Sequence, residues 1–307
     1  MRDPSELLAD AKLAYVSDYF SFAGADEHGP VVFALDTNRG RDGDRFEAEH
    51  LYGVLHEGGL GWVHLEGVGR YRNERCELLS IPDSAAFKFL GTPAHGIVVA
   101  SPSNGLTLAV EPLTERMRRD GVDRHFLLRS GAASLHWRGR RIPGRVIYEY
   151  LVGRGMNLMT RRSFSGLAGL EFLYLRTDED EDLYLQLHHG PGALDGIEPL
   201  YGFSAGGTGT VQLERLAMGS TRHAFARGLY RWPTSWEARW NEPGGVGSAH
   251  LSIESAMDLG NWVLAGFRMA PVTGELKTST KGTVGIHGLA EVLATAPPRL
   301  FRLVSRI

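Results

Sequence analysis

Apolar and polar residues alternate along most of the chain, with the period of two that a β-strand requires. Residues 62–71 keep this alternation, and residues 45–56 place Phe46, Ala48 and His50 on one side of the chain. Because successive side chains of a strand point to opposite faces, the pattern predicts strands with one face directed toward a core.

Short strand-like runs continue through the rest of the chain, separated by turns rich in Gly and Pro. We expect further strands at residues 29–36, 96–100, 106–110, 133–138, 145–152, 170–176, 183–188, 209–216, 235–240, 250–255, 262–269 and 282–290. Between two of them, Ser101-Pro-Ser-Asn-Gly105 contains the residues of a turn, which predicts a hairpin. Helical periodicity is confined to residues 4–12, 83–90 and 112–119. This pattern predicts an all-β protein of antiparallel sandwiches or barrels with few short helices.

Composition agrees with this class and adds a domain prediction. The chain has 307 residues, 43% of them hydrophobic, and 39 Gly, well above the average of about 7% in soluble proteins. That length and apolar content exclude disorder and suit one large or two ordinary domains. A basic stretch with Gly and Pro at residues 138–144 lies near the middle of the chain. We therefore predict two domains, residues 1–143 and 144–307.

Charge and motif content exclude several functions. With 33 Lys and Arg against 36 Asp and Glu, the net charge is −3, so we expect no nucleic-acid partner. The single cysteine, Cys76, cannot form an internal disulfide and is expected to be a small buried residue. Nucleotide-binding, zinc-protease and serine-hydrolase motifs are missing, and no cofactor or metal is expected. Without a secretion signal or an apolar run of about 18 residues, we expect a cytoplasmic protein that does not span a membrane.

Two polar motifs have simple structural explanations. Residues 178–182 are five consecutive carboxylates without the spacing and Gly of a calcium loop, and they separate two strand-like runs. A solvated hairpin tip is expected there. His188 and His189 follow the second of these runs, and neighbouring residues of a strand face opposite sides. At most one of the two histidines therefore faces the interior.

The most charged segment is residues 36–50, which includes Asp36, Glu49 and His50. One interpretation is a long polar hairpin loop. The other is that its ions pair at the mouth of a barrel, while Glu49 or His50, on alternate faces of the next strand, points into a cavity. A carboxyl group desolvated by apolar walls has a raised pKa and suits a general acid, and a histidine can take that role near neutral pH.

Three features in this region belong together: Asp36-Thr-Asn-Arg-Gly-Arg-Asp-Gly, a strand containing Glu47 to His50, and Gly61-Trp62. They resemble the first half of proteins related to carotenoid 1,2-hydratase (hydroxyneurosporene synthase). That double-lipocalin group also includes AttH-like proteins and certain fungal Diels–Alderases.

The second half of the chain is similar to the same group, and the similarity spans residues 15–293. Its matching segments are Leu170-Glu-Phe-Leu-Tyr-Leu before Leu183-Tyr-Leu-Gln-Leu, Tyr230-Arg-Trp-Pro-Thr-Ser-Trp-Glu-Ala-Arg-Trp240, Asn261-Trp262 and Gly282-Thr-Val-Gly-Ile-His-Gly-Leu-Ala-Glu291. The chain departs from the pattern at His287, where an acidic residue is usual, and at Ala290, where an aromatic residue is usual. Glu149-Tyr150 matches the group's Glu-His pair only in part, with Tyr150 in the position of the histidine.

The resemblance implies a fold and a function. The fold is two lipocalin-like antiparallel barrels in tandem, each of a size to enclose one apolar ligand. The implied function is a cofactor-independent cyclase or lyase, which cyclises, hydrates or dehydrates a hydrophobic isoprenoid or polyketide-derived intermediate. The residues expected to act as acids, bases or hydrogen-bonding groups are Glu49, His50 and Glu149, and those expected to line the substrate pocket are Trp62, Tyr148, Tyr150 and Trp262.

Two other functions remain open at this point. Many lipocalins are non-catalytic carriers of a lipid or pigment, and a carrier requires a nearly apolar cavity wall. A carbohydrate-processing β-sandwich enzyme would use two carboxylates from residues 36–49 and surface tryptophans. The expected partner is a hydrophobic small molecule, and the expected state is a monomer or homodimer.

Overall fold

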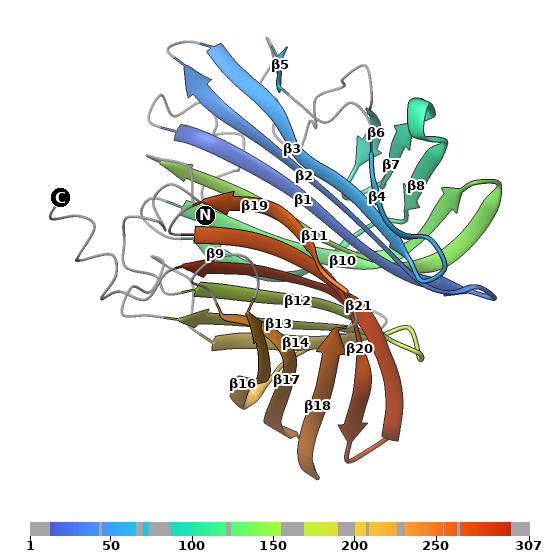
Figure 1. Ribbon diagram of the computed structural model, residues 1–307, viewed down its shortest axis with the longest axis vertical. Coiled ribbons are helices and arrows are strands. Elements are labelled where there is room, and N and C mark those ends of the chain that lie inside the picture. Colours follow the sequence, from blue (N-terminus) through green and yellow to red (C-terminus); the bar gives the residue numbers. More distant parts are fainter. Residues whose placement is uncertain are drawn as a thin grey trace, which may run out of the picture. The chain divides into compact units, whose positions relative to one another are not determined.

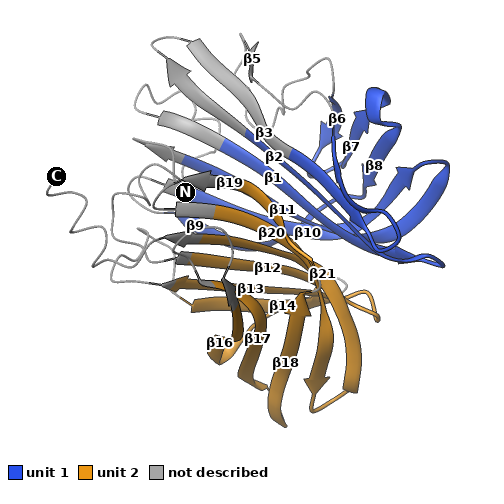
Figure 2. Cartoon of the chain, viewed as in Figure 1, with its two compact units in different colours: residues 1–157 blue, residues 158–307 orange. Residues whose placement is uncertain are grey.

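A computed structural model describes most of the chain in two compact units, residues 1–157 and 158–307 (Figure 2). The described residues are 13–42, 45–65, 70–73, 87–120, 124–154, 169–189, 200–206, 209–225, 231–242, 244–253, 255–262 and 265–295. The predicted helix at residues 4–12 and Cys76 lie outside these ranges. Strand β11 (Arg140–Arg154) runs across the predicted boundary between residues 143 and 144, because it pairs along its length with strands of the first unit.

The first unit is one antiparallel sheet with the strand order β4-β3-β2-β1-β11-β10-β8-β7-β6 (Figure 1). Two further strands lie off this path, β5 beside β3 and β9 beside β10. The strands are β1 (Leu13–Asp26), β2 (Gly29–Asp42), β3 (Arg45–Glu57), β4 (Gly61–His64), β5 (Arg70–Asn73), β6 (Lys88–Thr92), β7 (Gly96–Ser101), β8 (Leu106–Val110), β9 (Thr114–Asp120), β10 (Arg124–Trp137) and β11.

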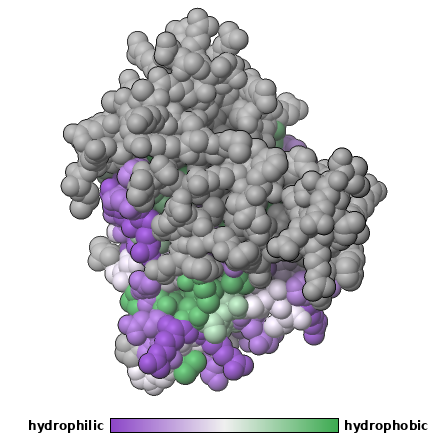
Figure 3. All heavy atoms as spheres, turned by 90° about the vertical axis from the view of Figure 1, so that its left-hand side faces the viewer, coloured by the Kyte–Doolittle hydropathy of each residue, from purple (hydrophilic) through white to green (hydrophobic). Residues whose placement is uncertain are grey.

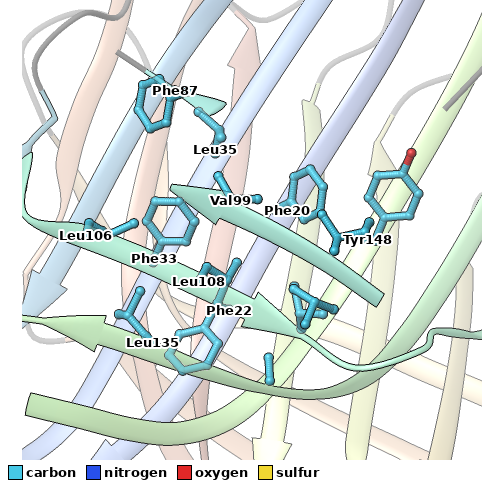
Figure 4. Packing of buried hydrophobic residues seen from close by; sticks show 14 of the residues in the cluster. Phe20, Phe22, Phe33, Leu35, Phe87, Val99, Leu106, Leu108, Leu135 and Tyr148 are labelled. Atoms are coloured by element: carbon cyan, nitrogen blue, oxygen red, sulfur yellow. The ribbon is translucent and has the colours of Figure 1, made fainter. Parts of the chain in front are cut away.

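The inner face of this sheet is aromatic and aliphatic. Phe20 and Phe22 of β1 meet Phe33 of β2 and Leu106 and Leu108 of β8 in one buried cluster (Figure 4). Since β8 lies several strands away from β2 in the sheet, the sheet must curl to bring these side chains together. Each such side chain stabilises the fold by roughly 1.5–3 kcal/mol through its removal from water.

The second unit repeats the strand order of the first, as β15-β14-β13-β12-β21-β20-β18-β17-β16 with β19 beside β20. Its strands are β12 (Gly169–Thr177), β13 (Asp182–His189), β14 (Leu200–Gly206), β15 (Gly209–Gln212), β16 (Glu214–Phe225), β17 (Arg231–Glu242), β18 (Gly245–Ile253), β19 (Met257–Trp262), β20 (Ala265–Thr278) and β21 (Gly282–Thr295). Position by position, β12 corresponds to β1, β21 to β11, β20 to β10 and β19 to β9. The predicted fold class is confirmed: two curled antiparallel half-barrel sheets in tandem.

Tryptophans dominate the interior of the second unit. Trp232 and Trp236 of β17 are fully buried, and they pack with Leu173 of β12 and Leu251 of β18. Tryptophan buries more apolar surface than any other side chain, so these two residues contribute heavily to the core of this unit.

Local sequence signals had mixed success. The hairpin expected at residues 101–105 is confirmed, with the 3-10 helix η1 (Pro102–Asn104) between β7 and β8 and Gly105 at a φ of 61°. The helix expected at residues 112–119 is wrong, because β9 occupies most of that range. Pairing with β10 satisfies its backbone and buries Met117, which outweighs the weak helical preference of a short segment. The helix expected at residues 83–90 is also wrong at its described end, where β6 begins at Lys88.

The acidic run forms the predicted hairpin turn between β12 and β13, but only part of it is solvated. Asp178, Glu179 and Asp180 are exposed, whereas Glu181 is half-buried and Asp182 is buried at the start of β13. Lys281 donates to Glu181 at 2.7 Å and to Glu179 at 2.9 Å, and these bonds raise the pKa of its ammonium group.

Figure 3 shows the side of the molecule that faces left in Figure 1. Among the residues that the structure describes, hydrophobic and hydrophilic side chains lie next to each other on this surface. The large apolar side chains with the greatest exposure are Leu60, Leu90, Val211 and Val246. Single exposed apolar side chains are ordinary on folded proteins. Within the described ranges, no helix is long and apolar enough to cross a membrane.

Candidate active site in the first unit

A fully buried carboxyl group lies on the inner face of the first unit. Asp18 of β1 is 0% exposed, and the hydroxyl of Tyr148 on β11 donates to its Oδ1 at 2.5 Å. Tyr148 pairs with Phe20 and reaches Asp18 one step along the same face. A buried carboxyl group is costly unless it is hydrogen-bonded, and the phenol provides that bond.

Apolar side chains surround one side of this pair. The rings of Phe20 and Tyr148 lie 4.9 Å apart between centroids. In Figure 4, Tyr148 lies at the edge of the cluster, and its hydroxyl points away from the other labelled side chains. The polar pair therefore borders an aromatic wall, which is the arrangement that an acid acting on an apolar molecule requires.

Two predicted residues, Tyr150 and His50, lie in the same cross-strand row as Asp18. Tyr150 of β11 is opposite Asp18 on one side, and Thr37 of β2 is opposite it on the other. Thr37 is fully buried, and His50 of β3 is in turn opposite Thr37. Glu49 is opposite Asn38, and the side chains of Glu49 and His50 lie outside the described residues.

Glu149 lies on the other face of β11. Tyr148 and Tyr150 belong to the inner cluster, whereas Glu149 pairs with Tyr19 and Leu128, which face the other way. Both faces of the sheet are buried here, with Tyr19 only 4% exposed. The structure thus brings Tyr148 and Tyr150 to one site with Asp18 but does not bring Glu149 there.

The two predicted tryptophans are not part of this group. Trp62 of β4 pairs with His56, its ring 5.0 Å from the imidazole, and the neighbouring Val63 packs on the inner cluster instead. Trp62 therefore faces away from that cluster. Trp262 belongs to the second unit, opposite Ala265, and its side chain lies outside the described residues.

A guanidinium group completes the polar end of the inner face. Arg129 of β10 is directly opposite Tyr148 on one side and Glu115 of β9 on the other. Glu115, however, accepts two hydrogen bonds from Arg118, at 2.9 Å and 2.8 Å. The Nη1 atom of Arg129 is buried, and within the described part of the chain it has no hydrogen-bond partner.

The Glu115–Arg118 pair predicts a pH dependence. The hydrogen bonds from Arg118 hold the pKa of Glu115 below its ordinary value of 4.5, so the pair stabilises the folded state above that pH. The stabilisation is lost as the pH falls through the lower folded pKa. Because the pair is partly exposed, we expect Glu115→Gln to lower the free energy of unfolding by less than about 1 kcal/mol at neutral pH. The difference should shrink on acidification, as measured by urea unfolding; a difference that grows would contradict the assignment.

The second unit holds a comparable but self-contained polar set. Glu171 of β12 is 4% exposed and accepts a hydrogen bond from Trp236 Nε1 at 2.5 Å. Arg268 of β20 lies over the ring of Trp232 at 4.5 Å and pairs with Asp258 of β19 at 2.6 Å. Each of these groups has its partner inside the unit.

Of the adjacent histidines, His188 is buried, and the side chain of His189 lies outside the described residues. Tyr184 donates to Gln186 at 2.9 Å, and the Gln186 amide lies 2.8 Å from His188 Nε2. These three residues alternate with Leu183 and Leu185 of the inner cluster, so they face away from it. Within the described ranges, no group of three or more potential ligands is placed to hold a metal ion.

A hollow of about 210 Å³ lies on the outer face of the second sheet. Its walls include Glu237, Arg239, His250 and Glu275, which are charged or ionisable. Small-molecule sites are usually about 300–1,000 Å³ and mostly apolar, so this hollow does not suit a hydrophobic substrate.

Asp18 is the candidate site residue that sequence reasoning missed. Its signal is present, since Asp18 lies two and four residues before Phe20 and Phe22, on the same face of a strand. An isolated carboxylate in an apolar face is unusual, because charged groups are rarely buried without a partner.

The two units, each a curled antiparallel sheet with the same strand order and an apolar inner face, define a tandem lipocalin-like protein. The chain is similar to the solved structure of an AttH-like protein from Nitrosomonas europaea, with 12% identity over 95% of this chain and 96% of that chain and a TM-score of 0.63. Kievitone hydratase from Nectria haematococca matches at 12% identity over 91% of this chain and 89% of that one, with a TM-score of 0.60.

These likenesses confirm, at the level of the fold, the resemblance to the AttH-like double-lipocalin group that the sequence predicted. No family model matches the chain, and no curated protein matches it in sequence. At 12% identity a shared fold does not define a shared activity, which depends on the site.

Proposed function

We propose that the protein is a cofactor-independent cyclase or lyase for a hydrophobic isoprenoid or polyketide-derived intermediate, with its active site around Asp18 and Tyr148. The observation that supports this most directly is a fully buried, hydrogen-bonded carboxyl group that borders the apolar cluster of the inner face. A carrier gains nothing from such a group, because burial of a polar pair only weakens an apolar binding site.

The pair can hold and move a proton. Asp18 Oδ1 accepts the Tyr148 hydroxyl, and the carboxyl group and the phenol are both groups that serve as general acids or bases. For hydration or dehydration, the proton would be exchanged with an alkene or an alcohol. For cyclisation, a hydrogen bond to a carbonyl oxygen would activate the substrate.

The aromatic wall supports either reaction. Phe20, Tyr148 and Tyr150 would hold an apolar chain in a folded conformation, which lowers the entropic part of the barrier. Their ring faces would also stabilise a carbocation formed by protonation of an alkene. The kievitone hydratase likeness supports hydration among these choices, as an analogy of fold only.

The proposal is tested with the purified protein and a panel of prenylated aromatics, linear isoprenoids and polyketide-derived polyenes in isotopically labelled water. Mass spectrometry distinguishes the reactions: gain of one labelled water marks hydration, loss of one water marks dehydration, and a new isomer of unchanged mass marks cyclisation. Any of these, dependent on Asp18, supports the proposal.

A non-catalytic carrier is the alternative outcome. Native mass spectrometry would then reveal a lipid or pigment bound in stoichiometric amount and unchanged after incubation. That result, together with no product from any member of the panel, would overturn the enzymatic proposal.

A further inference from the structure

We propose that Arg129 binds a carboxylate of the substrate, so that the ligand of the first unit is a hydrophobic carboxylic acid. This inference rests on the proposed site around Asp18 and Tyr148 and names the class of its ligand. It starts from the position of Arg129 on the inner face, directly opposite Tyr148.

The register places the guanidinium group within reach of the site. Side chains directly opposite each other on neighbouring antiparallel strands have Cβ atoms about 4.5–5.5 Å apart. Arg129 therefore lies beside the phenol that bonds to Asp18, with Tyr148 between Arg129 and Asp18. A carboxylate held by Arg129 would lie next to the proton-transfer pair without direct contact with Asp18.

The carboxylate opposite Arg129 is hydrogen-bonded to another arginine. Glu115 is the cross-strand neighbour of Arg129 on β9, and both its carboxylate oxygens accept hydrogen bonds from Arg118, although the charge of Arg129 also helps to lower the pKa of Glu115. Arg129 Nη1 is thus a buried donor with no partner in the described part of the structure. Leaving a buried donor of a charged group unsatisfied is costly, so an acceptor on the ligand would gain affinity by satisfying it.

The second unit provides an internal comparison. Arg268 lies on β20, which corresponds to β10, and its cross-strand neighbour Asp258 lies on β19, which corresponds to β9. There the arginine and its acidic neighbour are bonded at 2.6 Å, and the guanidinium also covers Trp232. Corresponding strands therefore pair the arginine with an acidic side chain in the second unit, whereas in the described part of the first unit one guanidinium nitrogen of the arginine has no hydrogen-bond partner.

The apolar part of the ligand would approach the aromatic cluster at its edge. Phe20, Phe22 and Phe33 extend from the polar end toward the β1–β2 turn, and they are buried against the side chains of β8. The hydrocarbon body of an acid bound head-first at Arg129 would therefore meet the cluster first at Tyr148, on its edge. Arginine suits this task, because its planar fork matches the two oxygens of a carboxylate.

Binding of dodecanoate and dodecanol, measured by isothermal titration calorimetry at neutral pH, tests the inference. We expect the wild-type protein to bind dodecanoate at least about tenfold more tightly than dodecanol. Arg129→Met should abolish this preference, mainly by weakening the binding of dodecanoate. Arg268→Met, the matched change in the second unit, should leave the preference intact.

A second variant avoids any change at Arg129. With Arg118→Met, Glu115 loses its partner and becomes available to its neighbour Arg129, so dodecanoate should bind more weakly while dodecanol binding stays the same. Thermal unfolding of each variant verifies that it is folded. Wild-type protein that binds the acid and the alcohol equally, or Arg129→Met protein that retains the preference, would overturn the inference.

These results are separable from those of the turnover panel. Arg129-dependent binding of dodecanoate with no turnover of any panel compound, acids included, would support the ligand class and contradict the enzymatic proposal. Turnover of neutral compounds alone, with no preference for dodecanoate, would support the enzymatic proposal and contradict the proposed ligand class.

Discussion

Asp18→Asn is expected to lower turnover by about 10²–10⁴-fold, the usual contribution of a general acid or base. Asparagine has the shape of aspartate and can still accept a hydrogen bond from the Tyr148 hydroxyl, but its amide cannot take up or release a proton near neutral pH. The measurement is the rate of product formation with whichever panel compound the wild-type protein converts.

Two companion variants sharpen this result. Tyr148→Phe removes the hydroxyl that bonds to Asp18 and should also lower turnover, while the ring remains in the inner cluster. Asp36→Asn is the matched control: Asp36 lies on the neighbouring strand β2 opposite Tyr19, on the other face, where it accepts a hydrogen bond from Ser17. If Asp18→Asn retained wild-type turnover, or Asp36→Asn lost it equally, the site would be misassigned.

Gly288→Ala is expected to lower the free energy of unfolding by about 1–3 kcal/mol or more, the usual range for overpacking a core. Gly288 of β21 is buried between Leu175 and Val272 on the neighbouring strands. An added Cβ would collide with the Tyr174 carbonyl oxygen and lie 2.8 Å from Leu175 Cα. These atoms are backbone, so the two strands would have to separate.

The control for this substitution is Gly219→Ala on β16. Gly219 is exposed, and an added Cβ there has no heavy atom within 4 Å. We expect a change of less than about 1 kcal/mol, and in the stabilising direction where the backbone permits, because alanine restricts the unfolded chain. Urea unfolding of the two variants side by side measures the contrast; equal destabilisation would show that strand conformation rather than the collision is responsible.

Much of the fold could be predicted because strand periodicity is local. The alternation seen in residues 45–56 lies within β3, and the turn residues Ser101 to Gly105 separate β7 from β8. The segment at residues 112–119 shows the limit, since its weak helical pattern lost to pairing with a strand that follows it in the chain. This pairing depends on residues 125–130, which lie outside the segment and therefore outside its local pattern.

Only part of the candidate site could be predicted from the sequence. Simple alternation places Tyr148 and Tyr150 on one face of β11 and Glu149 on the other. Because both faces are buried, composition could not decide which of them is the inner face of the sheet. The register shift between Asp36 and Thr37 changes the phase of β2 against β3, and it decides where His50 lies. Such a shift has no signature in one sequence.

The pairing of β1 with β11 has a consequence for biosynthesis. Asp18 and Tyr148 are 130 residues apart in the chain, yet they lie on adjacent strands in the middle of the first sheet. At about 5–20 residues per second, the ribosome makes Tyr148 roughly 6–26 s after Asp18. During that interval one edge of β1 has no strand to pair with. The hydrogen bond of the proposed active site therefore forms only with the step that joins the two halves of the sheet, and catalytic competence should appear no earlier than completion of the first unit.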